Sequence, residues 1–432
     1  MTLAWWLARE AGAALAAPGL AADALERLRR RRLADVLAHA RRAPWQRARL
    51  AAAGVTAADA AADPFAALAA LAPADKAELR AAGDGTLLDG RVDGGWYASR
   101  SSGSTGEPFT MRFDARAWAV LKYLVKLRTR RLAGLSAAHR VAVLDAFDPA
   151  DEGRSALERA GRLRRVSVLQ PAELVAAKLA AFRPDAAYGL ASALAECAGA
   201  LAAEGRRLEV PLLFTGGELL LPAVRRGLAA AYGARVIDVY GSSETKEIAW
   251  ECAEGRAHVN ADVVHLEVLD ADGRALPPGD EGEIVVTLLV NRAMPLLRYR
   301  LGDRGALRGA VGADACPCGR ALPTLDRISG RETEVLELAG ARVSPYVLTM
   351  ALESVGGLSR YQVRQSGAAA LAVRAEVPAS ADRAATTSRI RAALQRALPS
   401  PVAVEVELLD RFAPAAGAKF RVVETRRPAV SL

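Results

Sequence analysis

Short apolar segments alternate with helix-length segments between residues 140 and 240, and this alternation limits the possible folds more than any other feature of the chain. The strand candidates are Arg140–Leu144, Arg165–Leu169, Ala186–Tyr188, Pro211–Thr215 and Arg235–Tyr240. Apolar runs of this length, separated by helices, are typical of parallel strands covered on both faces. The pattern predicts an α/β fold with a mostly parallel sheet flanked by helices.

The regions on either side of this stretch have different patterns. Alanine-rich amphipathic segments predict a helical cap over about residues 1–82. Period-two alternation from His265 to Val290 predicts a small antiparallel β-rich subdomain within about residues 260–328. Beyond it, three strand-like segments and a helix near 386–398 predict an α+β module.

These patterns predict two domains. A chain of 432 residues is too long for one compact core of ordinary size. We expect a large N-terminal domain, residues 1–328, and a small C-terminal α+β domain, residues 329–432.

Composition argues against several classes of protein. The net charge is +9, but the six lysines and 52 arginines are spread along the chain without aromatic interleaving, so we expect no nucleic-acid partner. The basic run Arg29–Arg32 is interpreted as a solvated helix face. No apolar run approaches the roughly 18 to 20 residues that span a bilayer, so we expect no membrane segment. Four cysteines cannot form a disulfide framework in so long a chain, which favours a cytoplasmic location.

A loop rich in glycine and hydroxyl groups follows the strand predicted at Trp96–Ser99. It consists of Ser101, Ser102, Gly103, Ser104, Thr105 and Gly106. Glycines allow backbone N–H groups to turn toward an anion, and serine and threonine add donors, so the loop suits a triphosphate. A plain turn is the alternative interpretation. The loop lacks the Gly-Lys-Ser/Thr ending of a P-loop NTPase.

Further glycine-bearing motifs follow in order. They are Thr215-Gly216-Gly217-Glu218, Tyr240-Gly241-Ser242-Ser243-Glu244, Arg298-Tyr299-Arg300-Leu301-Gly302-Asp303 and Gly330-Arg331. Open α/β sheets bind nucleotides at loops that follow strands. With these motifs in this order, the chain resembles, over nearly its whole length, the adenylate-forming superfamily of acyl-CoA synthetases and adenylation domains. Within that superfamily it resembles the phenylacetate-coenzyme A ligase-like branch.

The resemblance implies an ATP-dependent acid–thiol ligase. A carboxylate would attack the α-phosphate of ATP to give an acyl-adenylate and pyrophosphate, and a thiol, expected to be that of coenzyme A, would take the acyl group. The loop from Ser101 to Gly106 would hold the β- and γ-phosphates, with Thr105 as its main hydroxyl donor. Glu244 would bind Mg²⁺. Asp303 would accept hydrogen bonds from the ribose hydroxyls.

The same resemblance assigns the remaining nucleotide contacts. Gly216, Gly217 and Tyr240 would frame the adenine, and Arg331 would reach the ribose or a phosphate. Glu218, Gly241, Ser242 and Ser243 belong to the same nucleotide-binding motifs. For Glu218 and Arg298 a scaffold ion pair is the alternative interpretation.

The chain departs from its relatives near the C-terminus. Relatives carry a glycine-lysine pair whose lysine neutralises the α-phosphate. In Gly417-Ala418-Lys419 the position of that lysine is held by Ala418, and Lys419 follows one residue later. In an extended segment this offset turns the side chain to the opposite face unless a bulge restores it. Thr333 replaces the usual hinge aspartate or lysine of a mobile C-terminal domain, and Lys419 stays the candidate catalytic lysine.

Four potential metal ligands lie in two groups. They are Cys252, His258, Cys316 and Cys318. From local spacing alone, Cys252 could be a small core residue and Cys316-Pro317-Cys318 a turn. The resemblance implies a structural Zn²⁺, because phenylacetate-CoA ligase-like proteins include zinc-containing members with this pattern and four such ligands complete a closed site.

The acid is expected to lie near Phe147, Tyr188, Gly189 and Gly216. Asp145–Pro149 stands where phenylacetate ligases carry a glycine and aromatic stretch, so we expect another small acid, aryl or amino-substituted. A carrier-protein or amine acceptor, including nitrite activation for diazotisation, is one alternative. A nucleotide-binding protein with little catalysis is another. Both a monomer and a homodimer are compatible with the sequence.

Overall fold

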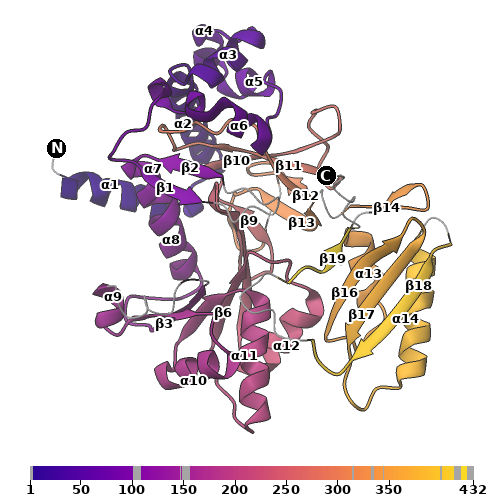
Figure 1. Ribbon diagram of the computed structural model, residues 1–432. Helices are drawn as coiled ribbons and strands as arrows, with labels where there is room; N and C mark the ends of the chain where they lie inside the picture. Colours follow the sequence, from indigo (N-terminus) through magenta and orange to yellow (C-terminus); the bar gives the residue numbers. More distant parts are fainter. Residues whose placement is uncertain are drawn as a thin grey trace. The chain divides into compact units, whose positions relative to one another are not determined.

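The computed structural model describes residues 3–100, 109–145, 147, 156–313, 316–331, 335–343, 345–398, 401–412 and 420–425. The chain divides into two compact units, each built from two stretches. Unit 1 comprises Met1–Leu135 and Val239–Ile328, and unit 2 comprises Ser136–Asp238 and Ser329–Leu432. Figure 1 shows helices and sheets in both units of the described residues, which confirms the predicted α/β class. The division into domains at residue 328 stays a prediction.

Unit 1 begins with helices where the helical cap is predicted. These are α1 (Leu3–Ala16), α2 (Ala22–Ala40), α3 (Pro44–Ala52), α4 (Ala57–Ala62), α5 (Pro64–Ala69) and α6 (Lys76–Ala82), with the 3₁₀ turn η1 (Ala17–Gly19) after α1. Reciprocal capping boxes fix two of the starts, Thr56 with Asp59 at α4 and Asp75 with Glu78 at α6. Leucines such as Leu33, Leu37 and Leu68 form the core between these helices.

The rest of the first stretch of unit 1 leads to two short strands and a long helical segment. Its elements are η2 (Gly83–Thr86), η3 (Leu88–Gly90), β1 (Tyr97–Arg100), β2 (Thr110–Phe113), α7 (Ala115–Trp118), η4 (Ala119–Leu124) and α8 (Val125–Leu132). Strands β1 and β2 form an antiparallel pair. The strand predicted at Trp96–Ser99 is thus present as β1.

The second stretch of unit 1 forms an antiparallel sheet, as the period-two pattern predicts. Its strands are β8 (Lys246–Glu251), β9 (Ala257–Val259), β10 (Val264–Leu269), β11 (Gly282–Leu288), β12 (Tyr299–Gly309) and β13 (Thr324–Arg331). The order is β10-β11-β12-β13-β9-β8-β7, in which β7 (Arg235–Ser242) is the strand that passes from unit 2 into unit 1.

A buried carboxylate joins the helices of unit 1 to this sheet. Asp262, in the turn before β10, accepts a bidentate pair of hydrogen bonds from Arg128 of α8 at 2.8 and 2.9 Å. Arg32 of α2 adds a third hydrogen bond at 3.2 Å. Arg29 and Arg32 are both buried, so the interpretation of Arg29–Arg32 as a solvated helix face is wrong for these two residues. The Asp262 and Arg128 side chains are each 1% exposed. Removing one partner of such a buried pair leaves an uncompensated charge in a low-dielectric interior.

Asp262→Asn should therefore lower the free energy of unfolding by about 3 to 5 kcal/mol, measured by urea denaturation. Asp272→Asn is the matched control, because Asp272 pairs with Arg274 at 2.7 Å but the two side chains are 68% and 76% exposed. That control should change stability by less than about 0.5 kcal/mol. Equal effects of the two substitutions would contradict the role given to Asp262.

The first stretch of unit 2 contains the parallel sheet. Its strands are β3 (Val141–Asp145), β4 (Leu163–Ser167), β5 (Ala186–Gly189) and β6 (Leu212–Gly216), ordered β6-β5-β3-β4. The helices are α9 (Ala156–Arg159), α10 (Ala172–Phe182), α11 (Ala191–Ala203) and α12 (Pro222–Tyr232). Each strand agrees with its sequence prediction to within about two residues, the usual uncertainty of element boundaries. Leu144, Leu179, Leu194 and Leu213 are fully or almost fully buried between the sheet and the helices.

The second stretch of unit 2 is the predicted α+β module. It contains β14 (Leu336–Leu338), β15 (Ala341–Val343), α13 (Pro345–Glu353), β16 (Arg360–Gly367), β17 (Ala370–Glu376), α14 (Arg383–Ala397), β18 (Ala403–Leu409) and β19 (Val423–Glu424). The main sheet has the order β18-β17-β16-β19. Its core joins Leu348 and Leu352 of α13 and Ile390 of α14 to Val363 and Val373 of the sheet.

Among the described residues, no helix combines the length and apolar character needed to cross a membrane. A cytoplasmic location stays a prediction.

Candidate nucleotide site

The turn between β7 and β8 has a tightly constrained backbone. A Cβ atom at Gly241 would lie 2.2 Å from the carbonyl oxygen of Lys246, so only glycine fits there. The Ser242 hydroxyl accepts hydrogen bonds from the backbone N–H groups of Glu244 and Thr245, both at 3.2 Å. Such side-chain-to-backbone bonds stabilise tight turns. The turn thus holds Glu244 at a defined position in unit 1.

Glu244 is a buried, ionised carboxylate. Its Oε1 atom lies 2.7 Å from Nζ of Lys76, and the Glu244 side chain is 7% exposed. Burial opposes ionisation, but the hydrogen bond and the charge of Lys76 hold the pKa of Glu244 below its ordinary value. Burial, together with the charge of the Glu244 carboxylate, raises the pKa of Tyr299. Glu244 therefore presents a fixed negative charge.

Tyr240 and Asp303 come from strands at opposite ends of the series β12-β13-β9-β8-β7. In a flat sheet four strand spacings would separate them by about 19 Å. The Tyr240 hydroxyl nevertheless donates to Oδ2 of Asp303 at 2.7 Å. This part of the sheet must therefore be strongly curled, and the curl brings an aromatic ring and a carboxylate from distant motifs together.

Lys246 connects the turn after β7 to the strand that precedes the glycine and hydroxyl loop. Its ammonium donates to the Ser99 hydroxyl at 2.5 Å and to the Ser243 carbonyl at 2.8 Å. Ser99 lies on β1, two positions before Ser101. Burial, with the nearby charges of Lys122 and Lys126, lowers the pKa of Lys246 to about 8. Lys246 has a left-handed backbone with φ of 66°, which is uncommon outside glycine.

The predicted acid-binding residues gather at one edge of the parallel sheet of unit 2. Tyr188 pairs with Phe214 and Gly189 with Thr215, so Gly216 follows directly at the carboxyl end of β6. Phe147 follows β3 at the same edge, where its carbonyl accepts a hydrogen bond from the Ser167 hydroxyl at 2.5 Å. This edge is where open α/β sheets bind ligands.

Glu218 has a hydrogen-bonding role in unit 2. Its carboxylate accepts from the backbone N–H and hydroxyl of Ser192 at 3.0 and 2.5 Å and from the backbone N–H of Phe420 at 3.0 Å. The preceding Gly217 has a φ of 83°. In unit 1, Arg298 pairs with Glu267 at 3.1 Å and donates to the Leu71 carbonyl, which favours its scaffold interpretation.

Some predicted residues cannot be placed. Ser101, Ser102, Gly103, Ser104, Thr105, Gly106, Ala418 and Lys419 lie outside the described residues. The backbone of Arg331 ends β13 in unit 2. Their roles stay predictions.

The four potential metal ligands converge in unit 1. The ligand atoms of Cys252, His258, Cys316 and Cys318 all lie within 4.8 Å of one another. The two sulfurs of Cys252 and Cys316 are 3.8 Å apart, and Nε2 of His258 lies 3.1 Å from the Cys318 sulfur. Tetrahedral Zn²⁺ with bonds of about 2.3 Å requires sulfur atoms about 3.8 Å apart. The arrangement fits a closed structural site.

The structure resembles solved acid–CoA ligases. It superposes on 2-hydroxyisobutyryl-CoA ligase in the postadenylation state with a TM-score of 0.78 at 22% identity, covering 95% of this chain and 92% of that one. A benzoate CoA ligase from Burkholderia xenovorans LB400 gives a TM-score of 0.53 at 16% identity, over 76% and 67% of the two chains. The chain has the adenylate-forming fold.

Sequence comparisons support the predicted resemblance to phenylacetate-coenzyme A ligases. The chain is 36% identical to the phenylacetate-coenzyme A ligase of Thermus thermophilus over 135 residues, which are 30% of this chain and 29% of the ligase. It is 27% identical to the Pseudomonas putida phenylacetate-coenzyme A ligase over 259 residues, 57% of this chain and 56% of the ligase. The matched parts therefore cover less than two thirds of either relative. No family model matches the chain.

Sequence reasoning did not single out Lys76, Lys246 or Tyr299 at this site of the adenylate-forming fold. Tyr299 stands inside the Asp303 motif, but its position near Glu244 depends on tertiary structure. The signal that could have drawn attention to the two lysines is the rarity of lysine, since the chain has only six. Lysine carries a compact ammonium that arginine cannot replace at every position.

The lowered pKa of Lys246 predicts a pH dependence of stability. Between about pH 8 and pH 10.4 the folded chain has released the Lys246 proton while the unfolded chain retains it, so stability should rise with pH. Over this pH interval the free energy of unfolding of the wild type should rise by about 2 kcal/mol more than that of Lys246→Met, as measured by urea denaturation at several pH values. Lys178→Met, a lysine removal in unit 2, is the matched control. Loss of the rise in stability with pH in Lys178→Met, or its persistence in Lys246→Met, would contradict the assignment of this rise to Lys246.

Proposed function

We propose that the protein is an ATP-dependent ligase that activates a small carboxylic acid as an acyl-adenylate and transfers the acyl group to coenzyme A. The observation that carries this proposal is the buried, ionised Glu244, held by Lys76 in an adenylate-forming fold. The similarity to phenylacetate-coenzyme A ligases supports the reaction class. The acid itself is proposed only as small, and aryl or amino-substituted.

The Glu244 carboxylate fits a magnesium ligand. Mg²⁺ prefers hard, anionic oxygen ligands, and Glu244 keeps its charge despite being buried. Bound there with ATP, Mg²⁺ would offset the charge of the triphosphate. Lys76, 2.7 Å from the same carboxylate, holds the side chain in place and stabilises its ionised form.

The Tyr240–Asp303 pair fits a ribose-binding role. An ionised carboxylate only accepts hydrogen bonds, and the vicinal hydroxyls of ribose are donors. Tyr240 donates to one oxygen of Asp303 at 2.7 Å, which orients the carboxylate. In the same proposal, Lys246 holds Ser99 beside the Ser243 carbonyl, so the loop from Ser101 would start from a fixed point.

The deciding experiment measures pyrophosphate release with ATP, Mg²⁺ and a panel of aryl, amino-substituted and short aliphatic acids. At least one acid should stimulate release, and adding coenzyme A should give the thioester. Glu244→Gln keeps the side chain's size but removes its charge, so it should slow release by about a hundredfold or more, the loss of several kcal/mol of charge stabilisation. Glu254→Gln, in the turn between β8 and β9, is the control and should behave as wild type.

The outcomes separate the alternatives. Release without a thioester would favour a carrier-protein or amine acceptor over coenzyme A. No release with any acid would contradict the proposed ligase and favour a nucleotide-binding protein with little catalysis. Full activity of the Glu244→Gln variant would contradict the proposal that Glu244 binds Mg²⁺.

We also propose that Cys252, His258, Cys316 and Cys318 bind one structural Zn²⁺. Three thiolates and one imidazole complete a tetrahedral shell with no open position for a substrate, so the ion would pin the turn between β8 and β9 to Cys316 and Cys318.

The purified protein should contain about one equivalent of zinc by elemental analysis, the content of a single closed site. Cys318→Ser should lose most of it and unfold at a lower temperature, because binding free energy contributes to folding. Cys197→Ala is the control, since Cys197 is a buried cysteine in α11, in the other unit. Zinc below about half an equivalent in wild type, or unchanged zinc in Cys318→Ser, would contradict the site.

A further inference from the structure

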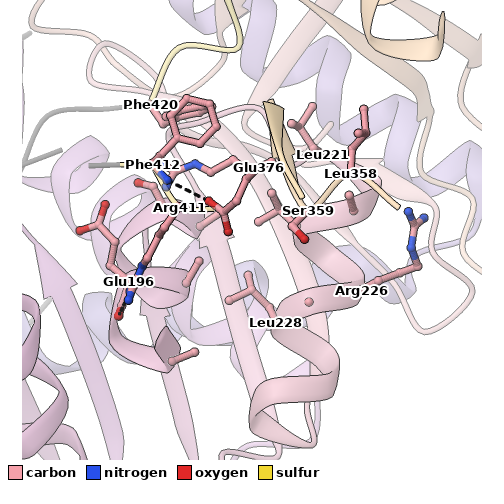
Figure 2. Close-up of a pocket in the computed structure, with 18 of the residues that line it drawn as sticks. Glu196, Leu221, Arg226, Leu228, Leu358, Ser359, Glu376, Arg411, Phe412 and Phe420 are labelled. Carbon is pink, nitrogen blue, oxygen red and sulfur yellow. Dashed lines mark hydrogen bonds between the residues drawn. The ribbon is translucent and has the colours of Figure 1, made fainter. Parts of the chain in front are cut away.

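Unit 2 contains a cavity to which the proposed reaction assigns no ligand, although Glu218 of a predicted nucleotide motif is among its lining residues. It has a volume of about 540 Å³ and lies between α11 and α12 on one side and the C-terminal α+β module on the other. Figure 2 shows Leu221, Leu228, Leu358, Phe412 and Phe420 among its lining residues. Small-molecule sites usually measure about 300 to 1,000 Å³ and combine an apolar wall with a few polar groups. The cavity has the size and the wall of such a site.

Arg360 supplies a buried cation to this cavity. It begins β16 and is 8% exposed, and its guanidinium carbon lies 3.8 Å from the centre of the Phe420 ring. Among the described residues, its Nη2 atom is buried and has no hydrogen-bond partner. A buried donor left without an acceptor is unfavourable because it has lost its hydrogen bonds to water. A ligand that brings an acceptor to Nη2 would restore such a bond.

The two aromatic rings form a corner beside this guanidinium. Phe412 and Phe420 meet edge to face with centroids 5.3 Å apart. The Arg360 guanidinium is also 5.6 Å from the Phe412 centroid. The Arg360 guanidinium therefore lies between two aromatic rings, which fixes the direction of its N–H donors. The same rings make the adjacent wall of the cavity apolar. Such a corner suits a ligand with one anionic end and an apolar body.

The charges around the cavity limit how much negative charge it can accept. Three carboxylates and three guanidiniums line it, from Glu196, Glu218, Glu376, Arg226, Arg360 and Arg411. Two of the carboxylates have backbone donors of their own, Glu218 from Ser192 and Phe420 and Glu376 from Phe412. The balanced lining favours a single negative charge over the double charge of a phosphate.

We propose that this cavity binds a small monocarboxylic acid with an apolar body. The carboxylate accepts a charge-assisted hydrogen bond from Nη2 of Arg360, and the body lies against Phe412, Phe420 and Leu228. The site adjoins the carboxyl ends of β5 and β6, since Ser192 and Glu218 line it, but its lining residues do not include Phe147, Tyr188, Gly189 or Gly216, to which the activated acid is assigned. It does not rest on the proposed ligase activity, because its readout is binding without nucleotide.

Isothermal titration calorimetry without ATP tests the site with benzoate, phenylacetate, cyclohexanecarboxylate and 4-methylpentanoate, and with the corresponding neutral amides. At least one acid should bind wild type, and its amide should bind about tenfold more weakly or not at all. Arg360→Met keeps an apolar stem but removes the donor. It should lower the affinity for that acid by about tenfold or more. Arg360→Lys, which retains a cation, should restore part of the affinity.

Two further variants distinguish this cavity from other acid sites. Arg226→Met alters an arginine of the cavity whose side chain is 68% exposed, and it should leave affinity within about twofold of wild type. Ala195→Phe fills the cavity from α11 and should abolish the same binding event while thermal unfolding stays cooperative. No binding by any acid, or binding that survives both Arg360→Met and Ala195→Phe, would overturn the proposal.

Discussion

The arrangement of unit 1 depends on one buried carboxylate. Asp262 binds Arg128 of α8 and Arg32 of α2, so two helices far apart in sequence are held to the turn before β10. Burying this charge is unfavourable, and it is tolerated because Arg128 binds both carboxylate oxygens while Arg32 satisfies a third lone pair. Alternative helix packings that separate these groups would leave charges unpaired in the interior.

This ionic cluster extends toward the candidate nucleotide site. Arg128 also donates to the Asn260 amide oxygen at 2.7 Å, and the Asn260 amide donates to the backbone carbonyl of Glu247 at 3.0 Å. Glu247 follows Lys246 on β8, and Lys246 fixes Ser99. Hydrogen bonds, joined through the peptide bond between Lys246 and Glu247, thus lead from the helical layer to the strand before the glycine and hydroxyl loop. Residues outside the proposed ligand contacts therefore help to position the site.

The amino-acid sequence was sufficient to predict the structural features that depend on a local pattern of residues. Apolar runs predicted β3, β5, β6 and β7 because a parallel strand buried on both faces must be apolar throughout. The four potential metal ligands were singled out through the resemblance, because their local spacing alone also fits a core cysteine and a turn, and only folding brings Cys252 and Cys318 together. The Tyr240–Asp303 contact required the curl of the sheet, which no local pattern encodes.

The Glu218 carboxylate joins two parts of unit 2 by accepting from Ser192 of α11 and from the backbone N–H of Phe420. Phe420 lines the cavity at Arg360. A small acid in that cavity would therefore lie against a segment that Glu218 ties to α11. By thermodynamic reciprocity, a ligand that alters this tie and an acid in the cavity would change each other's affinity by the same factor.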